Sequence, residues 1–142
     1  MNKMFTAEAA ITIHAAASKV WEALTKPELI KEYLFGTEVT TDWNMGSLIT
    51  YKGVRDGAVY ENQGKVLQIK REKLLVSAFW SSLSGLSKTA SSYRIIRYEL
   101  TAKGRETRLT ITQSNNESHE ESVQSEQIWK TMFNGIKKLV EG

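Results

Sequence analysis

Two glutamates and two arginines are the residues of this chain best suited to acid–base or ionic chemistry. Glu61, Glu99, Arg94 and Arg97 fall in two stretches whose pattern of polar and apolar residues allows either face to point inward. An inward carboxylate can act as a general acid or base, and an inward guanidinium can bind a ligand carboxylate. The alternative is that all four side chains form ion pairs on the surface. We favour this alternative.

Metal binding and nucleophilic catalysis have few candidate residues. The two histidines, His14 and His119, are predicted outward on a strand and in the first turn of the last helix, so they do not converge on a metal ion. The chain contains no cysteine, which excludes disulfides and thiolate chemistry. A serine triad would need Asp42 or Asp56 from predicted turns, and no serine stands in a GxSxG motif. We therefore expect no metal and no cofactor, and binding rather than catalysis.

A set of aromatic and apolar residues has the character of a groove for a small hydrophobic molecule. Aromatic side chains offer large apolar faces, and tryptophan and tyrosine add a polar group that orients a ligand. Core packing alone would explain any single member of the set, so the prediction of a cavity depends on the group. The predicted ligand-binding residues are Leu34, Phe35, Trp43, Tyr51, Trp80, Tyr98, Trp129, Met132 and Phe133.

The last stretch of the chain must supply one wall of this groove. Ser118 and Glu121 have the spacing of a capping box, which predicts that a helix begins there. From Trp129 to Val140, apolar residues recur every three or four positions and form one stripe. Gly135 lies on the flank of the stripe, where it either permits a close approach of another segment or is merely tolerated.

The first forty residues predict a strand and two short helices. Alternation from Phe5 to Ile13 indicates a strand with one buried face. Residues 15–24 then form a short helix, and Thr25 with Glu28 has the spacing of a capping box that opens a second helix, which ends at Gly36.

Residues 38–115 predict short antiparallel strands separated by turns. Leu74, Val76, Ala78 and Trp80 alternate with their neighbours and indicate one buried face. Stretches 59–69 and 93–100 are ambiguous, and a bulge or strong curvature would explain them. The serine-rich connection 81–92, which holds Leu83 and Leu86, forms either a lid or a flexible loop.

Together these elements predict an α+β protein in which a curved antiparallel sheet wraps around a long C-terminal helix. The two short helices close one end of the groove. With 142 residues, of which 41% are hydrophobic, we expect a single domain, 1–142. No apolar run reaches the ~20 residues of a membrane span, and the first residues lack the apolar core of a signal peptide, so we expect a cytoplasmic protein.

The net charge of +3 is too small to indicate nucleic-acid binding by itself. The basic residues near predicted turns also lack the interleaved aromatic residues of single-strand binders, so we interpret them as a solvated rim. These residues are Lys70, Arg71, Lys73, Lys103, Arg105 and Arg108.

Four segments carry a family resemblance: "ITIHAAASKVWEALTKPELIKEYL", "MGSLITYKG", "GKVLQIKREKLLVSAFW" and "IWKTMFNGIKKLVE". Their order resembles the START-like, or Bet v 1-like (SRPBCC), superfamily with its helix-grip fold. Within it they resemble the activator of heat-shock protein 90 ATPase homologues, most clearly at Val20, Trp21, Gly46, Ser47 and Trp129.

The resemblance implies an internal cavity, because relatives in the superfamily bind lipids, hormones or polyketides. Two alternatives stay open: a co-chaperone-like interaction with a chaperone of the heat-shock protein 90 type, and a cyclase or hydrolase that acts on a cavity-bound substrate. A monomer and a homodimer are both compatible with the sequence.

Overall fold

The computed structural model describes residues 5–34, 36–81 and 93–141. Its strands are β1 (Ala7–Ile13), β2 (Glu38–Thr40), β3 (Leu48–Arg55), β4 (Ala58–Lys70), β5 (Leu74–Trp80), β6 (Arg94–Lys103) and β7 (Glu106–Ser114). Its helices are α1 (Ala17–Thr25), α2 (Pro27–Tyr33) and α3 (His119–Glu141). All seven strands pair antiparallel in one sheet of order β1-β7-β6-β5-β4-β3-β2.

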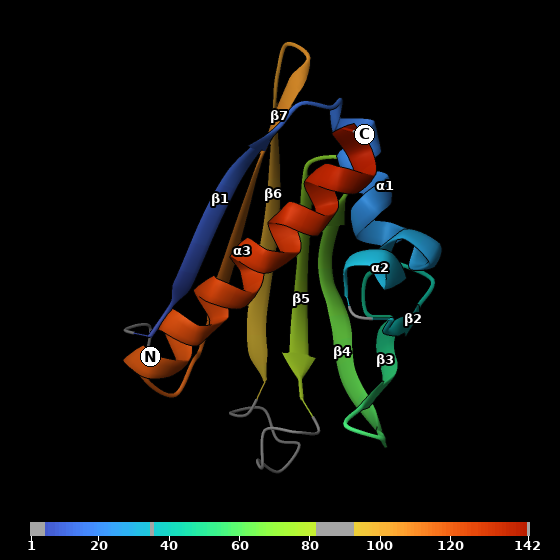
Figure 1. Ribbon diagram of the computed structural model, residues 1–142, viewed down its shortest axis with the longest axis vertical. Coiled ribbons are helices and arrows are strands. Elements are labelled where there is room, and N and C mark those ends of the chain that lie inside the picture. Colours follow the sequence, from blue (N-terminus) through green and yellow to red (C-terminus); the bar gives the residue numbers. More distant parts are fainter. Residues whose placement is uncertain (1–4, 35, 82–92, 142) are drawn as a thin grey trace.

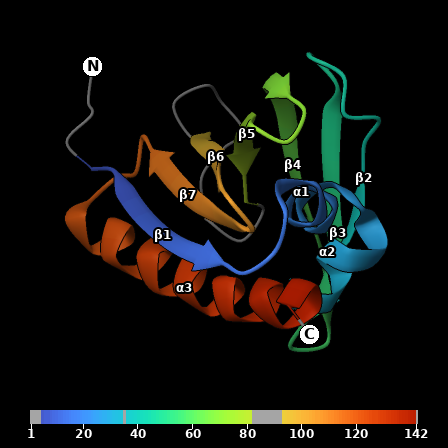
Figure 2. The same cartoon turned by 90° about the horizontal axis from the view of Figure 1, so that it is seen from above.

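The sheet curves around α3, which crosses its concave face diagonally (Figures 1 and 2). Helices α1 and α2 lie beside the C-terminal half of α3, at the end of the groove near β3. The buried side chains of Ile13, Val20, Leu109 and Ile136 belong to the core that the sheet and the helices share. The predicted helix-grip arrangement is confirmed.

The N-terminus of α3 is fixed by one half of the predicted capping box and by an ion pair. The backbone N–H of Glu121 donates to the Ser118 hydroxyl (3.1 Å), as predicted. The Glu121 carboxylate accepts from the backbone N–H of Glu117 (2.7 Å) and from two nitrogens of Arg94 (2.6 and 3.0 Å). Because Arg94 comes from β6, this pair joins the first turn of α3 to the sheet.

The start of α2 differs from the prediction. Lys26 precedes the helix, no side chain caps it, and Pro27 is its first residue. The Thr25 hydroxyl donates instead to the carbonyl oxygen of Trp21, one turn back in α1 (2.8 Å). The predicted capping box of Thr25 and Glu28 is therefore wrong. Proline begins the helix without a cap, because it has no N–H that needs a partner.

The end of α2 agrees with the prediction. Gly36 has a φ of +79°, which favours glycine, and its N–H donates to the carbonyl oxygen of Lys31 (3.0 Å).

The two ambiguous strands have different explanations. The pairing of β4 with β5 shifts register between Val66 and Gln68, so the predicted bulge is present in β4. Strand β6 pairs with both neighbours without such a shift. Its inner face carries Arg94, Ile96 and Leu100, which are all buried.

Two further expectations concern the connection between β5 and β6 and the absence of a membrane span. Leu83 and Leu86, which raised the question of a lid, lie outside the described residues. In the part of the chain that the structure describes, no helix combines the length and the apolar character needed to cross a membrane.

Candidate functional site

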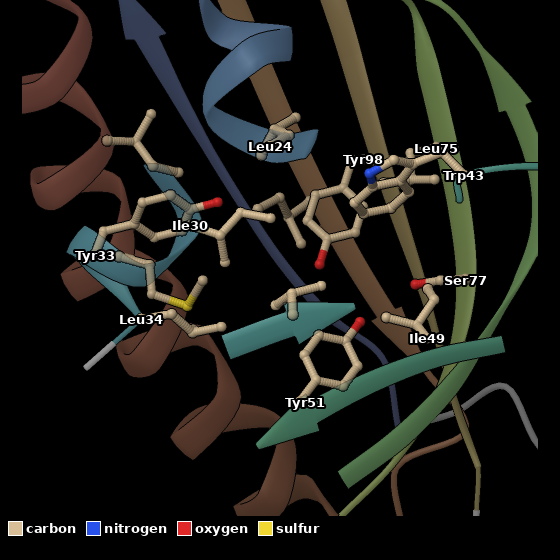
Figure 3. A pocket seen from close by; sticks show the side chains of 14 residues that line it. Leu24, Ile30, Tyr33, Leu34, Trp43, Ile49, Tyr51, Leu75, Ser77 and Tyr98 are labelled. Atoms are coloured by element: carbon tan, nitrogen blue, oxygen red, sulfur yellow. The ribbon is translucent and has the colours of Figure 1, made fainter. Parts of the chain in front are cut away.

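A small cavity lies between the concave face of the sheet, α2 and the C-terminal half of α3 (Figure 3). Its volume is about 40 Å³, measured as the space open to the centre of a water molecule. This space holds a few water molecules but is well below the volume of a typical pocket for a drug-sized ligand. The lining residues are apolar or bear a hydroxyl or indole group: Leu24, Ile30, Tyr33, Leu34, Val39, Trp43, Ile49, Tyr51, Leu75, Ser77, Tyr98, Ile111, Met132 and Ile136.

Three hydroxyl groups from three strands face this space. Tyr51 comes from β3, Ser77 from β5 and Tyr98 from β6, and in Figure 3 their oxygens point into the same region. Among the described residues, the one buried polar side-chain atom without a hydrogen-bond partner is Trp129 Nε1, and no hydrogen bond within those residues involves the three hydroxyls. The free volume therefore reaches the three oxygens, which leaves them available to a bound molecule.

Tyr33 also lines the cavity, but its hydroxyl is already used. It donates to the carbonyl oxygen of Ala23 in α1 (2.8 Å) and so ties α2 to α1. Burial raises the pKa of Tyr33 and Tyr51 well above the usual value for tyrosine. Burial is also the main cause that raises the pKa of Tyr98, and the nearby Tyr51 and Tyr33 raise it further. The phenols in this region are therefore protonated at physiological pH.

Trp43 forms a wall of the cavity that packs against the core without being part of it. Its indole Nε1 donates to the carbonyl oxygen of Thr25, the last residue of α1 (2.8 Å). Its backbone φ is +59°, which is unusual for a bulky residue. The side chain is only partly buried and packs against the core from outside. The indole thus makes one hydrogen bond, and the backbone that carries it is strained.

The opposite wall depends on Gly135. A Cβ atom built on Gly135 would lie 2.7 Å from the Cβ of Tyr33, well inside normal contact distance. The missing side chain allows α2 to lie directly against α3. Of the two explanations that the sequence left open, the close approach of another segment is the one observed.

Five of the nine predicted residues come together around the cavity: Leu34, Trp43, Tyr51, Tyr98 and Met132. The other four do not line it, or are not described. Trp129 and Phe133 are buried in the core, and the Trp129 ring packs edge-to-face against Tyr98 with ring centroids 5.9 Å apart. Trp80 lies on the opposite face of β5 from Ser77. Phe35 lies outside the described residues.

Sequence reasoning missed Tyr33 and Ser77 among the polar lining residues. In β5 it selected the alternation of Leu74, Val76 and Trp80 as the buried face, whereas Leu75 and Ser77 line the cavity. Both alternations begin with buried apolar residues. The adjacent leucines at the start of the strand were the one signal that both faces are covered.

Three of the four charged candidates form surface ion pairs. Glu61 lies 3.8 Å from the Lys52 ammonium, and Glu99 lies 3.4 Å from Arg97. The preferred prediction of surface ion pairs fits these residues. For Arg94 it is wrong, because this side chain is only 9% exposed and is neutralised by Glu121. None of the four lines the cavity.

The other polar candidates have structural partners at the surface. His14 is exposed, as predicted, and its Nδ1 lies 2.6 Å from Glu106. The side chain of Asp42 accepts from the Ser47 hydroxyl and from the backbone N–H of Asn44, and these bonds lower the pKa of Asp42. They stabilise the turn before β3. Within the described ranges, no three potential metal-ligating side chains are grouped together.

The basic residues are brought together at one end of the sheet. The backbone N–H of Leu100 donates to the carbonyl oxygen of Lys73 (2.9 Å), which places the β4–β5 turn beside β6. Thr101 of β6 pairs with Arg108 of β7, and the turn after Lys103 lies at the same end. Arg71 is mostly exposed and lies 3.6 Å from Glu72, as expected of a solvated rim.

Comparison with known families gives a match over most of the chain. The family described as "Activator of Hsp90 ATPase homolog 1-like protein" matches residues 14–141. The chain belongs to this family. The family resemblance of the four sequence segments is thereby confirmed. Comparison with curated proteins gives no match.

Several solved structures share the fold of this chain. The solution structure of protein ChR145 from Cytophaga hutchinsonii is 40% identical, with a TM-score of 0.85 over 98% of this chain and 95% of that chain. Protein MLL2253 from Mesorhizobium loti is 20% identical, with a TM-score of 0.78 over 94% and 95% of the two chains. The Aha1 dimer from Colwellia psychrerythraea is 20% identical, with a TM-score of 0.75 over 97% of each chain.

Proposed function

We propose that this protein binds a small hydrophobic molecule in the cavity between the sheet and α3. The observation that carries the proposal is the free volume itself, which apolar side chains enclose and into which three unbonded hydroxyls point. In a fully packed core such voids are few, and buried hydroxyls have a partner in the protein or in ordered water. An apolar pocket with a few convergent polar groups is the usual form of a small-molecule site.

Binding requires the cavity to enlarge, and Trp43 is the wall that we expect to move. A volume of about 40 Å³ does not admit an aromatic ligand without displacement of a side chain. Trp43 packs against the core from outside, and its indole makes one hydrogen bond, to Thr25. Its left-handed backbone costs on the order of 1–3 kcal/mol, part of which is released when the turn relaxes. Removal of the indole would enlarge the cavity by the volume of the ring.

Two substitutions with opposite expected effects test this proposal. A panel of uncharged aromatic compounds is screened by native mass spectrometry, and dissociation constants are measured for the compounds that bind. Trp43→Ala should strengthen binding about tenfold, because a ligand then replaces the indole, whereas Leu34→Trp should weaken it at least about tenfold by filling the rim. Met45→Trp is the matched control, because Met45 is 67% exposed and does not line the cavity.

Failure of every compound to bind both wild type and Trp43→Ala would contradict the proposal. Equal effects of Leu34→Trp and Met45→Trp would place the binding site elsewhere on the protein.

A second candidate function follows from the family description. The matched family is named for activation of the Hsp90 ATPase, so a co-chaperone-like interaction is the alternative. The test is the ATPase rate of a chaperone of that type at saturating concentrations of this protein. A rate that does not change argues against this candidate. For the third alternative, a cyclase or hydrolase, we find no support, because Glu61, Glu99, Arg94 and Arg97 are all absent from the cavity lining.

A further inference from the structure

We propose that the ligand is uncharged and carries a carbonyl-type oxygen, which accepts hydrogen bonds from two of the three hydroxyls of Tyr51, Ser77 and Tyr98. This inference rests on the proposed function and specifies the class of molecule that the cavity takes. It depends on how the sheet brings the three hydroxyls together and on the charge of their surroundings.

The register of the sheet explains why the three hydroxyls converge. Tyr98 pairs with Leu75 across β5 and β6, so Ser77 is its diagonal neighbour on the same face. Tyr51 lies two strands away from Ser77, beyond β4. Gly64 of β4 has no side chain, and a Cβ atom there would lie 3.5 Å from the Tyr51 ring. That is an ordinary contact distance, whereas the same Cβ atom would lie 2.5 Å from the carbonyl oxygen of Ala78, so the glycine permits the close approach of β4 and β5. The Tyr51 ring lies across β4 toward β5, where it packs edge-to-face on Phe79 with centroids 5.2 Å apart.

The cavity lining offers hydrogen-bond donors but no charge. None of the fourteen lining residues is acidic or basic. Arg94, the buried cation on the inner face of β6, is already paired with Glu121 at 2.6 Å. The phenols stay protonated, because burial raises the pKa of Tyr51 and Tyr98. A ligand carboxylate or phosphate would lose its hydration and meet no counter-ion, which is a large cost in an apolar site.

A pure hydrocarbon is also a poor match for these walls. It would displace any water from the hydroxyls and leave three polar groups without partners, and such groups carry a substantial penalty. A carbonyl oxygen has two lone pairs and can accept from two of the hydroxyls at once. The third hydroxyl can donate to a neighbouring hydroxyl or to a retained water molecule. The site thus favours an acceptor that is polar but neutral.

Three nearly isosteric probes separate these cases: α-methylstyrene, acetophenone and benzoate. They share a phenyl ring with a planar three-atom substituent and differ in whether it is a hydrocarbon, a ketone or a carboxylate. Dissociation constants are measured by NMR titration of the wild-type protein and of Trp43→Ala. We expect acetophenone to bind about threefold to tenfold tighter than α-methylstyrene. We expect benzoate to bind at least about a hundredfold more weakly than acetophenone.

Removal of single hydroxyls tests which groups recognise the ketone. Tyr98→Phe, Tyr51→Phe and Ser77→Ala should each reduce the preference for acetophenone over α-methylstyrene while α-methylstyrene still binds. Tyr60→Phe is the control, because the Tyr60 hydroxyl contacts Thr37 (2.7 Å) and does not line the cavity. Ser77→Ala is the smallest of these changes and provides the test if a tyrosine variant does not fold.

The outcomes separate this inference from the proposed function. A ketone preference that the three variants reduce and Tyr60→Phe retains supports the inference. Equal binding of acetophenone and α-methylstyrene overturns it and leaves the hydrophobic cavity as the binding site. Benzoate that binds as tightly as acetophenone overturns the requirement for an uncharged ligand. No binding of any probe to wild type or to Trp43→Ala overturns both proposals.

Discussion

Tyr33, Tyr51 and Tyr98 have similar surroundings but different roles. All three line the cavity and have a raised pKa, yet only the Tyr33 hydroxyl has a protein partner, the carbonyl oxygen of Ala23. Tyr33 therefore stabilises the packing of α2 on α1, whereas Tyr51 and Tyr98 keep their hydroxyls for the cavity. At this scale the distinction between core and site depends on hydrogen-bond partners and not on residue type.

The raised pKa values predict that the protein loses stability in alkaline solution. A tyrosine whose folded-state pKa lies above its unfolded value near 10 binds its proton more tightly in the folded protein. Its contribution to stability is complete below about pH 10 and is lost as the pH rises toward the folded-state pKa, by about 1.4 kcal/mol per pH unit for each tyrosine. Urea unfolding between about pH 8 and pH 11 measures this loss.

Lysine residues also titrate in this range, so a comparison between variants is needed. Tyr98→Phe removes one of the three buried phenols and should make the loss less steep than in wild type. Tyr60→Phe is the control, because Tyr60 lies outside the cavity and its hydroxyl contacts Thr37. Identical pH dependence in wild type and Tyr98→Phe would contradict the assignment of a raised pKa to Tyr98.

At the scale of elements, the position of α2 depends on a residue of α3. Gly135→Ala improves helix propensity by up to about 1 kcal/mol, but the new methyl group overlaps with Tyr33. We expect a net destabilisation of about 1–3 kcal/mol, because overpacking outweighs the propensity gain. Denaturant unfolding measures the change. Asn134→Ala, at an exposed position of the same helix, is the control and should be neutral or stabilising. A Gly135→Ala variant as stable as wild type would show that α2 moves away without cost.

Most elements were predictable from the sequence, because their signals are local. The apolar stripe of α3, the glycine that ends α2 and the bulge in β4 depend on spacing over a few residues. The cavity was harder to predict, because it depends on which face of a strand is covered by distant segments. Trp80 and Ser77 illustrate this: serine is usually exposed and tryptophan often buried, yet Ser77 is 2% exposed and lines the cavity, whereas Trp80 is on the other face.

Arg94 shows the same limit for charged residues. Its type predicts exposure, but its register on β6 points it inward, and Glu121 lies far along the chain. The partner of a buried charge cannot be identified from spacing when it comes from a different element. The Ser118 cap was predictable because its partner lies three residues away.

On the scale of the whole molecule, the two halves of α3 contact the sheet in different ways. The N-terminal half is secured by polar contacts, among them Arg94 with Glu121 (2.6 Å) and Gln113 with Ser125 (3.0 Å). The C-terminal half contributes Met132 and Ile136, which line the cavity opposite the strands. This half also makes polar contacts: Lys137 donates to the carbonyl oxygen of Thr12 (3.4 Å), and the Glu141 carboxylate accepts from the backbone N–H of His14 (2.7 Å). Helices α1 and α2 lie at the same end of the groove as the cavity (Figure 1). Both halves of the helix are thus attached to the sheet, and the C-terminal half faces the cavity.

The NMR signals of the four tryptophan indole N–H groups show directly whether a ligand enters the cavity beside Trp43. Trp43 lines the cavity and donates to Thr25, whereas Trp80 lies on the opposite face of β5. On addition of acetophenone, we predict that the Trp43 signal shifts in a saturable manner, because the ligand displaces this wall, while the Trp80 signal stays in place. Saturable binding that leaves the Trp43 signal unchanged, or that shifts the Trp80 signal instead, would contradict binding in this cavity.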